Sequence, residues 1–301
     1  MDLKQIEYIV KIDEERSITR AADKLFITQS ALNQQLIRLE KELGTRLFER
    51  GKTECNPTEA GRIYLEGARE ILKIRHTTYN RISDLLEDQR SHLSVGFTPN
   101  RGSDMFTWVY SRFHAMYPDV VIEPHELSVR AQQRQMEKGL LDVGFVTLAE
   151  QQKTGDTYLP LCREELFLIL PENHPKAYEH MDWEKAFPEI SLDLLREDSF
   201  VLLYRESTVR TILDEVFRKA DFAPRVLFDT RSNTTVLSMV QSGQCCGVVP
   251  AYYLRNHPEG IRVFSFEQHP DWEVAAFYKK GGYLSKPARM FIQLAKECWN
   301  I

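Results

Sequence analysis

Residues 17–61 read SITRAADKLFITQSALNQQLIRLEKELGTRLFERGKTECNPTEAG, and this stretch decides the fold of the first part of the chain. Ser17 and Thr28 are residue types that favour helix N-caps, so each predicts the start of a helix. A tight turn separates these two helices, and another helix is expected upstream over residues 3–15. Apolar steps of four, three and four predict the core face of the later helix: Leu32, Leu36, Leu39 and Leu43. Three helices in this arrangement form a helix-turn-helix.

The opposite face of the last of these helices carries mainly small and amide side chains. At about 100° per residue, that face presents Ser30, Asn33, Gln34, Ile37, Arg38 and Lys41. Asn and Gln can pair bidentately with adenine at the edge of a base pair. A solvent-exposed helix face has a similar composition, but the turn and the two helices upstream favour a recognition helix for DNA.

The segment after this helix contains turn-forming residues. Gly51 and the Asn-Pro pair at 56–57 suit a small β-hairpin wing. Arg50 and Lys52 could reach phosphates from such a wing. Residues 1–60 are therefore predicted to be a winged helix-turn-helix domain.

A long helix is predicted next, because Thr58 is a good N-cap and helical periodicity continues to about Arg90. Steps of three and four mark a predicted seam with one polar interruption: Leu65, Ala68, Leu72, Arg75, Tyr79, Ile82 and Leu86. A helix of this length extends roughly 45 Å, which a small domain cannot cover. Residues 58–91 are therefore interpreted as a linker helix that pairs with its copy in a second chain.

From His92 the pattern changes to short apolar strands that alternate with helices. The first set of strands and helices is expected at 92–98, 103–117, 120–127, 129–139 and 142–147. The second set is expected at 166–170, 199–204, 208–220, 225–229, 233–243, 246–250 and 261–266. A strand over 273–278 and a helix over 285–299 could join either set. Repeated strand–helix–strand units predict a parallel α/β sheet.

Composition and charge narrow the classes of function. The net charge is −5, and residues 1–60 hold ten Lys or Arg against eleven Asp or Glu, so any DNA contact must come from a local face. No apolar run approaches the roughly eighteen residues of a membrane span, and no signal peptide is expected. The five cysteines fit neither a disulfide framework nor a zinc site. We expect a cytoplasmic protein without membrane contact.

The N-terminal segment closely resembles the winged helix-turn-helix of LysR-type transcriptional regulators. The resemblance is gapless and rests on Ala21-Ala22, Leu25, Thr28-Gln29-Ser30-Ala31-Leu32, Leu36, Leu39-Glu40, Leu43-Gly44, Leu47-Phe48, Arg50 and Thr58-Glu59-Ala60-Gly61. Two later segments, 139–145 and 242–250, more loosely resemble motifs of the family's effector domain. Their order and spacing extend the resemblance to the whole chain.

This resemblance implies an α/β fold class with a mainly helical N-terminal winged helix-turn-helix, a long linker helix and a two-lobed effector domain over 92–301. The lobes would resemble those of a periplasmic binding protein and be joined by two crossover strands. Lobe I would comprise 92–162 and 268–301, and lobe II 163–267. The resemblance also implies a homodimer or homotetramer, a double-stranded DNA operator with an interrupted palindrome, and a small-molecule effector between the lobes. RNA polymerase would be a further partner.

DNA contacts carried over from the resemblance fall on Thr28, Gln29, Ser30, Asn33, Gln34, Arg38 and Arg50. The chain departs from the family's usual residues at four positions: Asn33, Gln34, Thr53 and Pro57. The family commonly has a basic residue at the second and third of these positions. Lys52 could take the place of the missing wing cation.

Ligands in such lobes bind at the carboxyl ends of strands, facing helix N-termini. Residues at these strand ends are predicted to contact the effector: Thr98, Asn100, Arg101, Ser128, Val129, Thr147, Arg205 and Thr208. The family's effector-contacting pair falls on Ser128 and Val129. Arginines could pair with a carboxylate, which favours an anionic effector: Arg101, Arg205 and Arg231. Helix capping is the alternative role for the nearby serines: Ser103, Ser128, Ser207 and Ser232.

Several other functions are weighed against an effector-controlled regulator. Cys245 and Cys246 are adjacent, which suits a buried strand better than a redox bridge. The histidines have no ligand spacing on one element, so no metal site is expected. No nucleophile elbow, P-loop or dinucleotide fingerprint occurs, so neither enzymatic activity nor a cofactor is predicted. Two alternatives stay open: an α/β domain that only oligomerises, and an enzyme fused to a DNA-binding domain.

Overall fold

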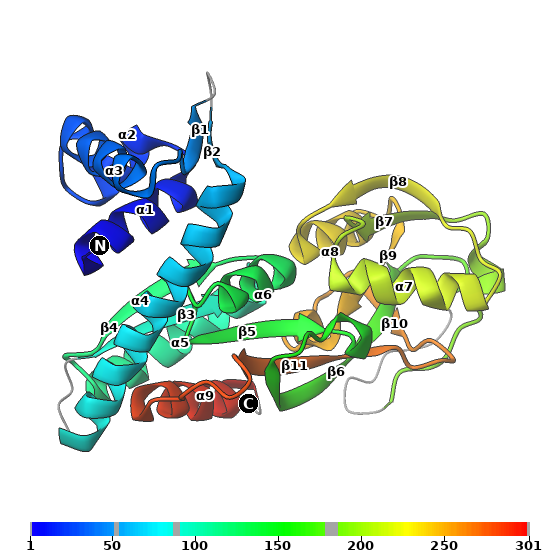
Figure 1. Ribbon diagram of the computed structural model, residues 1–301. Coiled ribbons are helices and arrows are strands. Elements are labelled where there is room, and N and C mark those ends of the chain that lie inside the picture. Colours follow the sequence, from blue (N-terminus) through cyan, green and yellow to red (C-terminus); the bar gives the residue numbers. More distant parts are fainter. Residues whose placement is uncertain (1, 51–53, 87–90, 178–185, 300–301) are drawn as a thin grey trace.

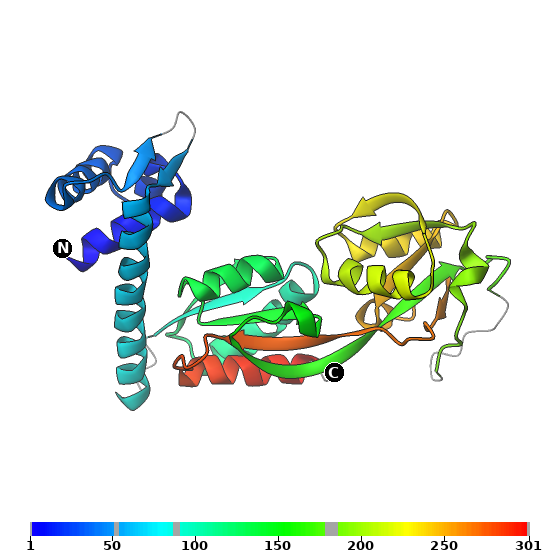
Figure 2. The same ribbon diagram turned by 45° about the vertical axis from the view of Figure 1, so that its right-hand side comes forward.

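Three parts of the chain follow one another along the molecule. A computed structural model describes residues 2–50, 54–86, 91–177 and 186–299. Helices and a small hairpin form an N-terminal domain, the long helix α4 (Glu59–Leu86) runs away from it, and two α/β lobes lie beyond that helix (Figures 1 and 2). None of the helices in these ranges is long and apolar enough to cross a membrane.

The N-terminal domain contains α1 (Leu3–Glu15), α2 (Ile18–Lys24) and α3 (Gln29–Leu43). The predicted caps are confirmed, since the hydroxyls of Ser17 and Thr28 each accept the N–H three residues further on. Three leucines of α3 are buried in the core that it shares with α1 and α2: Leu32, Leu36 and Leu39. The prediction for Leu43 is wrong, since this residue is 45% exposed. The helix ends there, and Gly44 with its φ of 70° turns the chain away beyond the core.

The wing consists of β1 (Phe48–Arg50) and β2 (Cys55–Pro57), which pair antiparallel. Gly61 in the first turn of α4 packs directly on it, because a Cβ at this position would lie 2.0 Å from the carbonyl oxygen of Leu47. Only glycine allows so close an approach. The Thr58 hydroxyl accepts the N–H of Gly61 at 3.0 Å. The predicted hairpin and helix cap are therefore both confirmed.

The apolar residues of α4 are divided between two faces, and this corrects the first part of the predicted seam. Leu65 and Ala68 are buried in the core of the N-terminal domain, where α1 packs on them, and Leu72 is partly buried there. These residues are therefore not available to a second chain. The exposed stripe of α4 comprises Ile63, Ile74, Ile82 and Leu85, which are 66%, 64%, 47% and 81% exposed. Ile82 belongs to the predicted seam too, and two other seam residues near the end of the helix, Tyr79 and Leu86, are 67% and 68% exposed. At about 100° per residue, the centre of the stripe is rotated by roughly 100° from the centre of the predicted seam.

The two lobes are built from the predicted elements. Lobe I holds β3 (His92–Phe97), α5 (Arg101–Met116), β4 (Val121–Glu126), α6 (Val129–Glu137), β5 (Val143–Leu148) and α9 (Lys286–Trp299). Lobe II holds β7 (Ser199–Leu203), α7 (Thr208–Lys219), β8 (Arg225–Thr230), α8 (Asn233–Gln241), β9 (Cys246–Pro250) and β10 (Ile261–Phe264). Short 3-10 helices are η1 (Glu150–Gln152), η2 (Leu192–Leu195) and η3 (Ala251–Leu254). Two strands pass between the lobes: β6 (Thr157–Pro171) and β11 (Asp271–Tyr278) (Figure 2).

The strands lie in the order β4-β3-β5-β11-β6-β9-β7-β8, and β10 pairs with β6. In lobe I, β3 runs parallel to β4 and β5, and in lobe II, β7 runs parallel to β8 and β9. The crossover strands β6 and β11 run antiparallel to their neighbours. The predicted parallel sheet is thus confirmed within each lobe and wrong at the crossover, because a chain that enters the second lobe and returns must reverse direction.

Each lobe has its own hydrophobic core. Phe113 and Phe145 lie in the core of lobe I, to which α9 contributes, and Phe200 lies in that of lobe II. Cys245 and Cys246 are free, buried thiols in the core of lobe II. Burial raises the pKa of Cys246 to about 12, so its thiolate does not form near neutral pH. Both cysteines therefore pack as core residues.

Candidate DNA-binding and effector-binding sites

The recognition helix α3 turns its polar face away from the core of the N-terminal domain. Its leucines face inward, which fixes the orientation of the opposite side. Thr28 caps the helix, because its hydroxyl accepts the N–H of Ala31 at 3.2 Å. The predicted DNA contacts of α3 share one surface, with Asn33 half-buried and the others exposed: Gln29, Ser30, Gln34 and Arg38.

A carboxylate fixes the wing relative to α3. The Oε1 atom of Glu40 accepts the N–H of Leu47 at 2.8 Å and that of Phe48 at 3.3 Å, where β1 begins. These two hydrogen bonds hold the start of the wing at a fixed position beside α3. The backbone of Arg50 ends β1, whereas its side chain and the whole of Lys52 lie outside the described residues.

One exposed aromatic residue of the N-terminal domain escapes the sequence patterns. Phe26 lies in the turn between α2 and α3 and is 96% exposed, with a φ of 54°. Helical periodicity gives no signal for it, because Phe26 belongs to neither helix.

A cavity of about 420 Å³ lies between the two lobes, which is a suitable size for a small molecule. Four helices, α5, α6, α7 and α8, begin at its wall. Residues from their first turns or caps line it: Asn100, Arg101, Ser128, Val129, Ser207, Thr208 and Asn233. Thr98 and Thr147 line it from strand ends. Because helix N-termini carry partial positive charge and free N–H groups, this arrangement favours an anion.

Three of these four helix starts are capped by the protein itself. The hydroxyls of Ser128, Ser207 and Ser232 accept N–H groups of α6, α7 and α8. The capping alternative is therefore confirmed for these three serines. It is wrong for Ser103, which lies inside α5 and donates its hydroxyl proton to Glu126 at 3.2 Å.

The start of α5 differs from the other three. Its N-cap residue, Asn100, has a φ of 61° and makes no side-chain capping bond. Such a backbone conformation is strained for a residue other than glycine, and strain of this kind gathers at ligand sites. Thr98 lies directly beside this turn, since a Cβ added to Gly102 would be 2.9 Å from its Oγ1 atom. The first N–H groups of α5 and the Thr98 hydroxyl are thus placed to bind one ligand oxygen.

Hydrogen bonds connect the lobes around the cavity. Thr208, which is buried in lobe II, donates its hydroxyl to the carbonyl oxygen of Thr147 in lobe I at 3.0 Å. The Tyr252 hydroxyl donates to Asp104 at 2.8 Å. Any movement that separates α7 from β5 must break the first of these bonds.

Arg101 was predicted to meet the ligand anion, but it pairs with a carboxylate of the protein. Its Nη1 atom contacts Glu164 of the crossover strand β6, and both side chains are 6% exposed. Glu164 also accepts the N–H of Tyr252 and the indole N–H of Trp272, each at 2.6 Å. Burial lowers the pKa of Arg101 to about 10, so the guanidinium is still charged at neutral pH. Arg101 therefore lines the cavity and connects α5 to the crossover strand β6. Because Glu164 already neutralises its charge, we do not expect Arg101 to pair with a ligand anion.

The structure places Arg205 outside this cavity, on the exposed turn before α7. Arg130 and Arg231 line the cavity, and the guanidinium of Arg231 lies 5.3 Å from the centroid of the Tyr204 ring. Sequence patterns also missed Tyr253 and Trp272. Tyr253 follows the end of β9, so the strand-end rule could have found it, whereas Trp272 lies within a crossover strand and carries no such signal.

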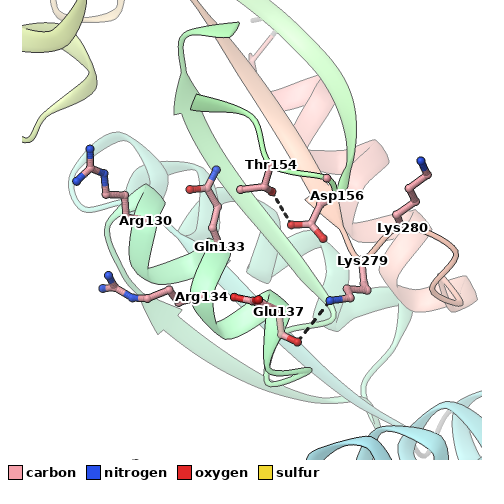
Figure 3. Close-up of a pocket in the computed structure, with 9 residues that line it drawn as sticks. Arg130, Gln133, Arg134, Glu137, Thr154, Asp156, Lys279 and Lys280 are labelled. Atoms are coloured by element: carbon pink, nitrogen blue, oxygen red, sulfur yellow. Dashed lines mark hydrogen bonds between the residues drawn. The ribbon is translucent and has the colours of Figure 1, made fainter. Parts of the chain in front are cut away.

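A second hollow of about 490 Å³ lies on the outer surface of lobe I, beside α6 and the end of β11 (Figure 3). Arg130 and Arg134 line it, but their guanidinium groups point away from Thr154 and Asp156 instead of toward a common point (Figure 3). Both arginines are exposed. The cavity between the lobes is therefore the stronger candidate for a ligand site. Among the described residues, no cluster of His, Cys, Asp and Glu could hold a metal ion.

Comparison with known proteins agrees with this architecture. Residues 3–62 match the family described as bacterial regulatory helix-turn-helix protein, lysR family, and residues 86–299 match the LysR substrate binding domain. A probable RuBisCO transcriptional regulator of Synechocystis sp. is 31% identical over 247 residues, which cover 80% of this chain and 69% of that protein. The Hca operon transcriptional activator HcaR of Escherichia coli is 28% identical over 300 residues, covering 99% of this chain and 98% of HcaR.

Solved structures show the same fold over nearly the full length. A full-length OxyR variant from Pseudomonas aeruginosa superposes with a TM-score of 0.72 at 24% identity, covering 99% of this chain and 94% of that one. Full-length CbnR in complex with its target DNA superposes with a TM-score of 0.60 at 19% identity, covering 99% of each chain. These families and relatives are transcriptional regulators and not enzymes. The chain is a member of the LysR family of bacterial helix-turn-helix transcriptional regulators.

Proposed function

We propose that the cavity between the lobes binds a small anionic effector, which controls DNA binding by the N-terminal domain. The observation that carries this proposal is the uncapped start of α5 beside Thr98, facing three further helix N-termini. A carboxylate or phosphate oxygen there would accept backbone N–H groups and the Thr98 hydroxyl. Arg130 of lobe I and Arg231 of lobe II add positive charge to the lining of the cavity.

The cavity also places requirements on the remainder of the ligand. Glu206 lines it, and the Oδ1 atom of the buried Asn233 has no hydrogen-bond partner within the described residues. Both groups are acceptors. The effector that fits best therefore carries a hydroxyl or amine donor on the side opposite its acidic group.

Replacing Thr98 with valine tests this site, because valine keeps the shape of threonine and removes only the hydroxyl. Losing one hydrogen bond to a charged oxygen should weaken effector binding by roughly tenfold to a hundredfold. The measurement is a dose–response of DNA binding to a ligand found by thermal-shift screening. Thr107→Val, on the exposed side of the following helix α5, is the matched control. An unchanged dose–response in both Thr98→Val and Ser128→Ala would exclude this site.

For DNA recognition, we propose that the exposed face of α3 reads base edges in the major groove. Asn33 and Gln34 would make the base contacts, while Thr28, Gln29, Ser30, Arg38, Arg50 and Lys52 contact the backbone or flanking bases. Glu40 supports this assignment, because it holds the wing in a fixed position beside the helix. The weakly acidic overall charge makes this local face the main source of affinity.

Gln34→Ala should lower affinity for the operator by about 1–3 kcal/mol and affinity for random DNA very little. The operator is first obtained by selecting bound duplexes from a random-sequence library. Fluorescence anisotropy with both DNA probes then compares the variant with Gln151→Ala, a control far from DNA on η1. Equal losses on both DNAs would show that α3 is not docked in this way.

For assembly, we propose that the exposed stripe of α4 pairs with its copy and gives a dimer with two recognition helices. Large apolar side chains are also exposed at the two outer edges of the sheet, on β4 at Val121 and on β8 at Val226, Leu227 and Phe228. These edges offer a second contact that could join dimers into a tetramer. RNA polymerase stays a predicted partner.

A regulator whose α/β domain only oligomerises is the second candidate function, and those apolar sheet edges favour it. The two functions differ in their response to small molecules. Thermal stabilisation of the protein by a metabolite, lost in Thr98→Val, supports the effector site. Absence of any stabilising compound in a screen of small acids and phosphate esters would favour the oligomerisation domain.

A further inference from the structure

Two residues in the last three turns of the linker helix α4 attach it to lobe I: His76 and Asp84. The Nε2 atom of His76 lies 2.8 Å from Oδ1 of Asp142, the residue that precedes β5. The other carboxylate oxygen of Asp142 accepts the N–H of Ser94 in β3 at 2.9 Å. Asp142 therefore connects α4 to two adjacent strands of lobe I.

The second attachment is Asp84, close to the end of α4. Its Oδ2 atom accepts the hydroxyl of Tyr283 at 2.6 Å and the N–H of Lys286 at 2.8 Å. Lys286 is the first residue of α9, and its Nζ atom donates to the carbonyl oxygen of Asp84 at 2.8 Å. Ser285 caps α9 by accepting the N–H of Ala288, so Asp84 supplies a second acceptor to the same helix start. A negative charge at a helix N-terminus is favourable.

This attachment leaves the exposed stripe of α4 free. At about 100° per residue, the face that carries His76, Asn80 and Asp84 is roughly 135° away from the stripe. The linker helix can therefore rest on its own lobe I and pair with a second copy at the same time. The proposed dimer and the attachment do not compete.

Both attachments lie on elements that also reach the cavity between the lobes. Asp142 precedes β5, and Thr147 near the other end of that strand lines the cavity. The helix α9 packs on α5, whose first turn forms the uncapped wall. Because β5, α5 and α9 are closely packed, they are stiff. A displacement where they meet α4 should therefore move their ends at the cavity.

We propose that Asp84 and the His76–Asp142 pair form a rigid joint between the linker helix and lobe I, which transmits changes in the cavity to the DNA-binding domain. This inference rests on the proposed function, since the signal begins in the cavity. Without the joint, lobe I could move relative to α4, and its movement would not reach the DNA-binding domain. By linkage, the same joint carries the effect of DNA binding back to the cavity.

Protonation of His76 strengthens its contact with Asp142. The hydrogen bond to Asp142 raises the pKa of His76 above its usual value, against the opposing effect of burial. The stabilising pair is therefore fully present below the ordinary histidine pKa and is lost as pH rises through the raised value. Other charged or titratable groups face the same space from α1, α4 and lobe I: Glu7, Lys11, Arg69, Lys73, Arg75, His92, Glu123 and Lys138. The joint should therefore loosen as pH rises through the raised pKa of His76.

The joint is tested with full-length protein and selected operator DNA as the only ligand. Hydrogen exchange is measured for segments 284–290 and 92–97, which receive the two attachments. In the double variant His76→Gln, Asp84→Ala, exchange in both segments should be faster by about tenfold or more. Asp119→Asn, an exposed acidic residue elsewhere on lobe I, should behave as the unmodified protein. Unchanged exchange in the double variant would overturn the joint.

Transmission is tested in the same samples by adding DNA. In the unmodified protein, operator binding should change exchange in the cavity segments 98–103 and 127–133. The double variant should bind operator with equal affinity, yet its cavity segments should no longer respond. A response of equal size in the double variant, or none in the unmodified protein, would overturn the inference. This outcome is distinct from failure of the proposed effector site, which Thr98→Val tests separately. In the unmodified protein the response should fall as pH rises, and in His76→Gln it should not depend on pH over that range.

Discussion

Replacing Arg101 with methionine is expected to lower the free energy of unfolding of the effector domain by about 3–5 kcal/mol. The change removes one partner of a buried ion pair and leaves the Glu164 carboxylate without its cation. Two N–H groups, from Tyr252 and Trp272, would still bind Glu164 but would not neutralise its charge. Urea denaturation followed by tryptophan fluorescence measures the effect, because Trp272 reports on the pair directly.

The companion variants separate charge from packing. Glu164→Gln keeps the shape and should destabilise less than Glu164→Ala. The double variant Arg101→Met, Glu164→Met should be more stable than the sum of the single losses predicts, since no unpaired charge is buried in it. A loss below about 1 kcal/mol in Arg101→Met would mean that the pair is hydrated and does not link α5 to the crossover strand.

The second large effect is expected at Leu85, the most exposed residue of the stripe on α4. Leu85→Asp would place a charge in the proposed interface of both chains, where it has no partner. Burying such a group is costly, so dimerisation should weaken by about a hundredfold or more. Operator affinity should fall with it, because one recognition helix reads only one half-site. Sedimentation velocity and anisotropy on the same sample measure both quantities.

Tyr79 provides the matched control for this prediction. It is 67% exposed on the same helix but belongs to the predicted seam, away from the stripe. Tyr79→Asp should leave the dimer intact if the stripe is the interface. Dissociation by Tyr79→Asp and not by Leu85→Asp would show that the chains pair through the exposed end of the seam that the sequence alone suggests.

The sequence predicts local structure well because the signals for it are local. Ser17, Thr28 and Thr58 are caps in the structure, and each binds an N–H within the next three residues. Most strands and helices of both lobes lie within a few residues of their predicted bounds, but the crossover strand β6 begins nine residues before the strand predicted at 166–170. The recognition face of α3 follows from periodicity alone, because its leucines must face the core.

The errors arise where a residue's partner is distant in the sequence. Periodicity identifies Leu65 as apolar, but it cannot show that α1 covers this residue before a second chain does. Arg101 lines the cavity at the start of α5, yet its partner Glu164 lies on a distant element, the crossover strand β6. Asp84 and His76 carry no signal at all, since their roles depend on how α4 lies against lobe I. Burial and pairing across long separations therefore require the structure.

The central claim is that a ligand between the lobes and DNA on α3 influence each other. Isothermal titration of operator DNA at saturating and at zero ligand, with a ligand that stabilises the protein in the thermal screen, tests it most directly. Operator affinity should change by about 5–150-fold, and ligand affinity should change by the same factor when DNA is bound. A ligand that requires Thr98 for binding and yet leaves operator affinity unchanged would contradict the account.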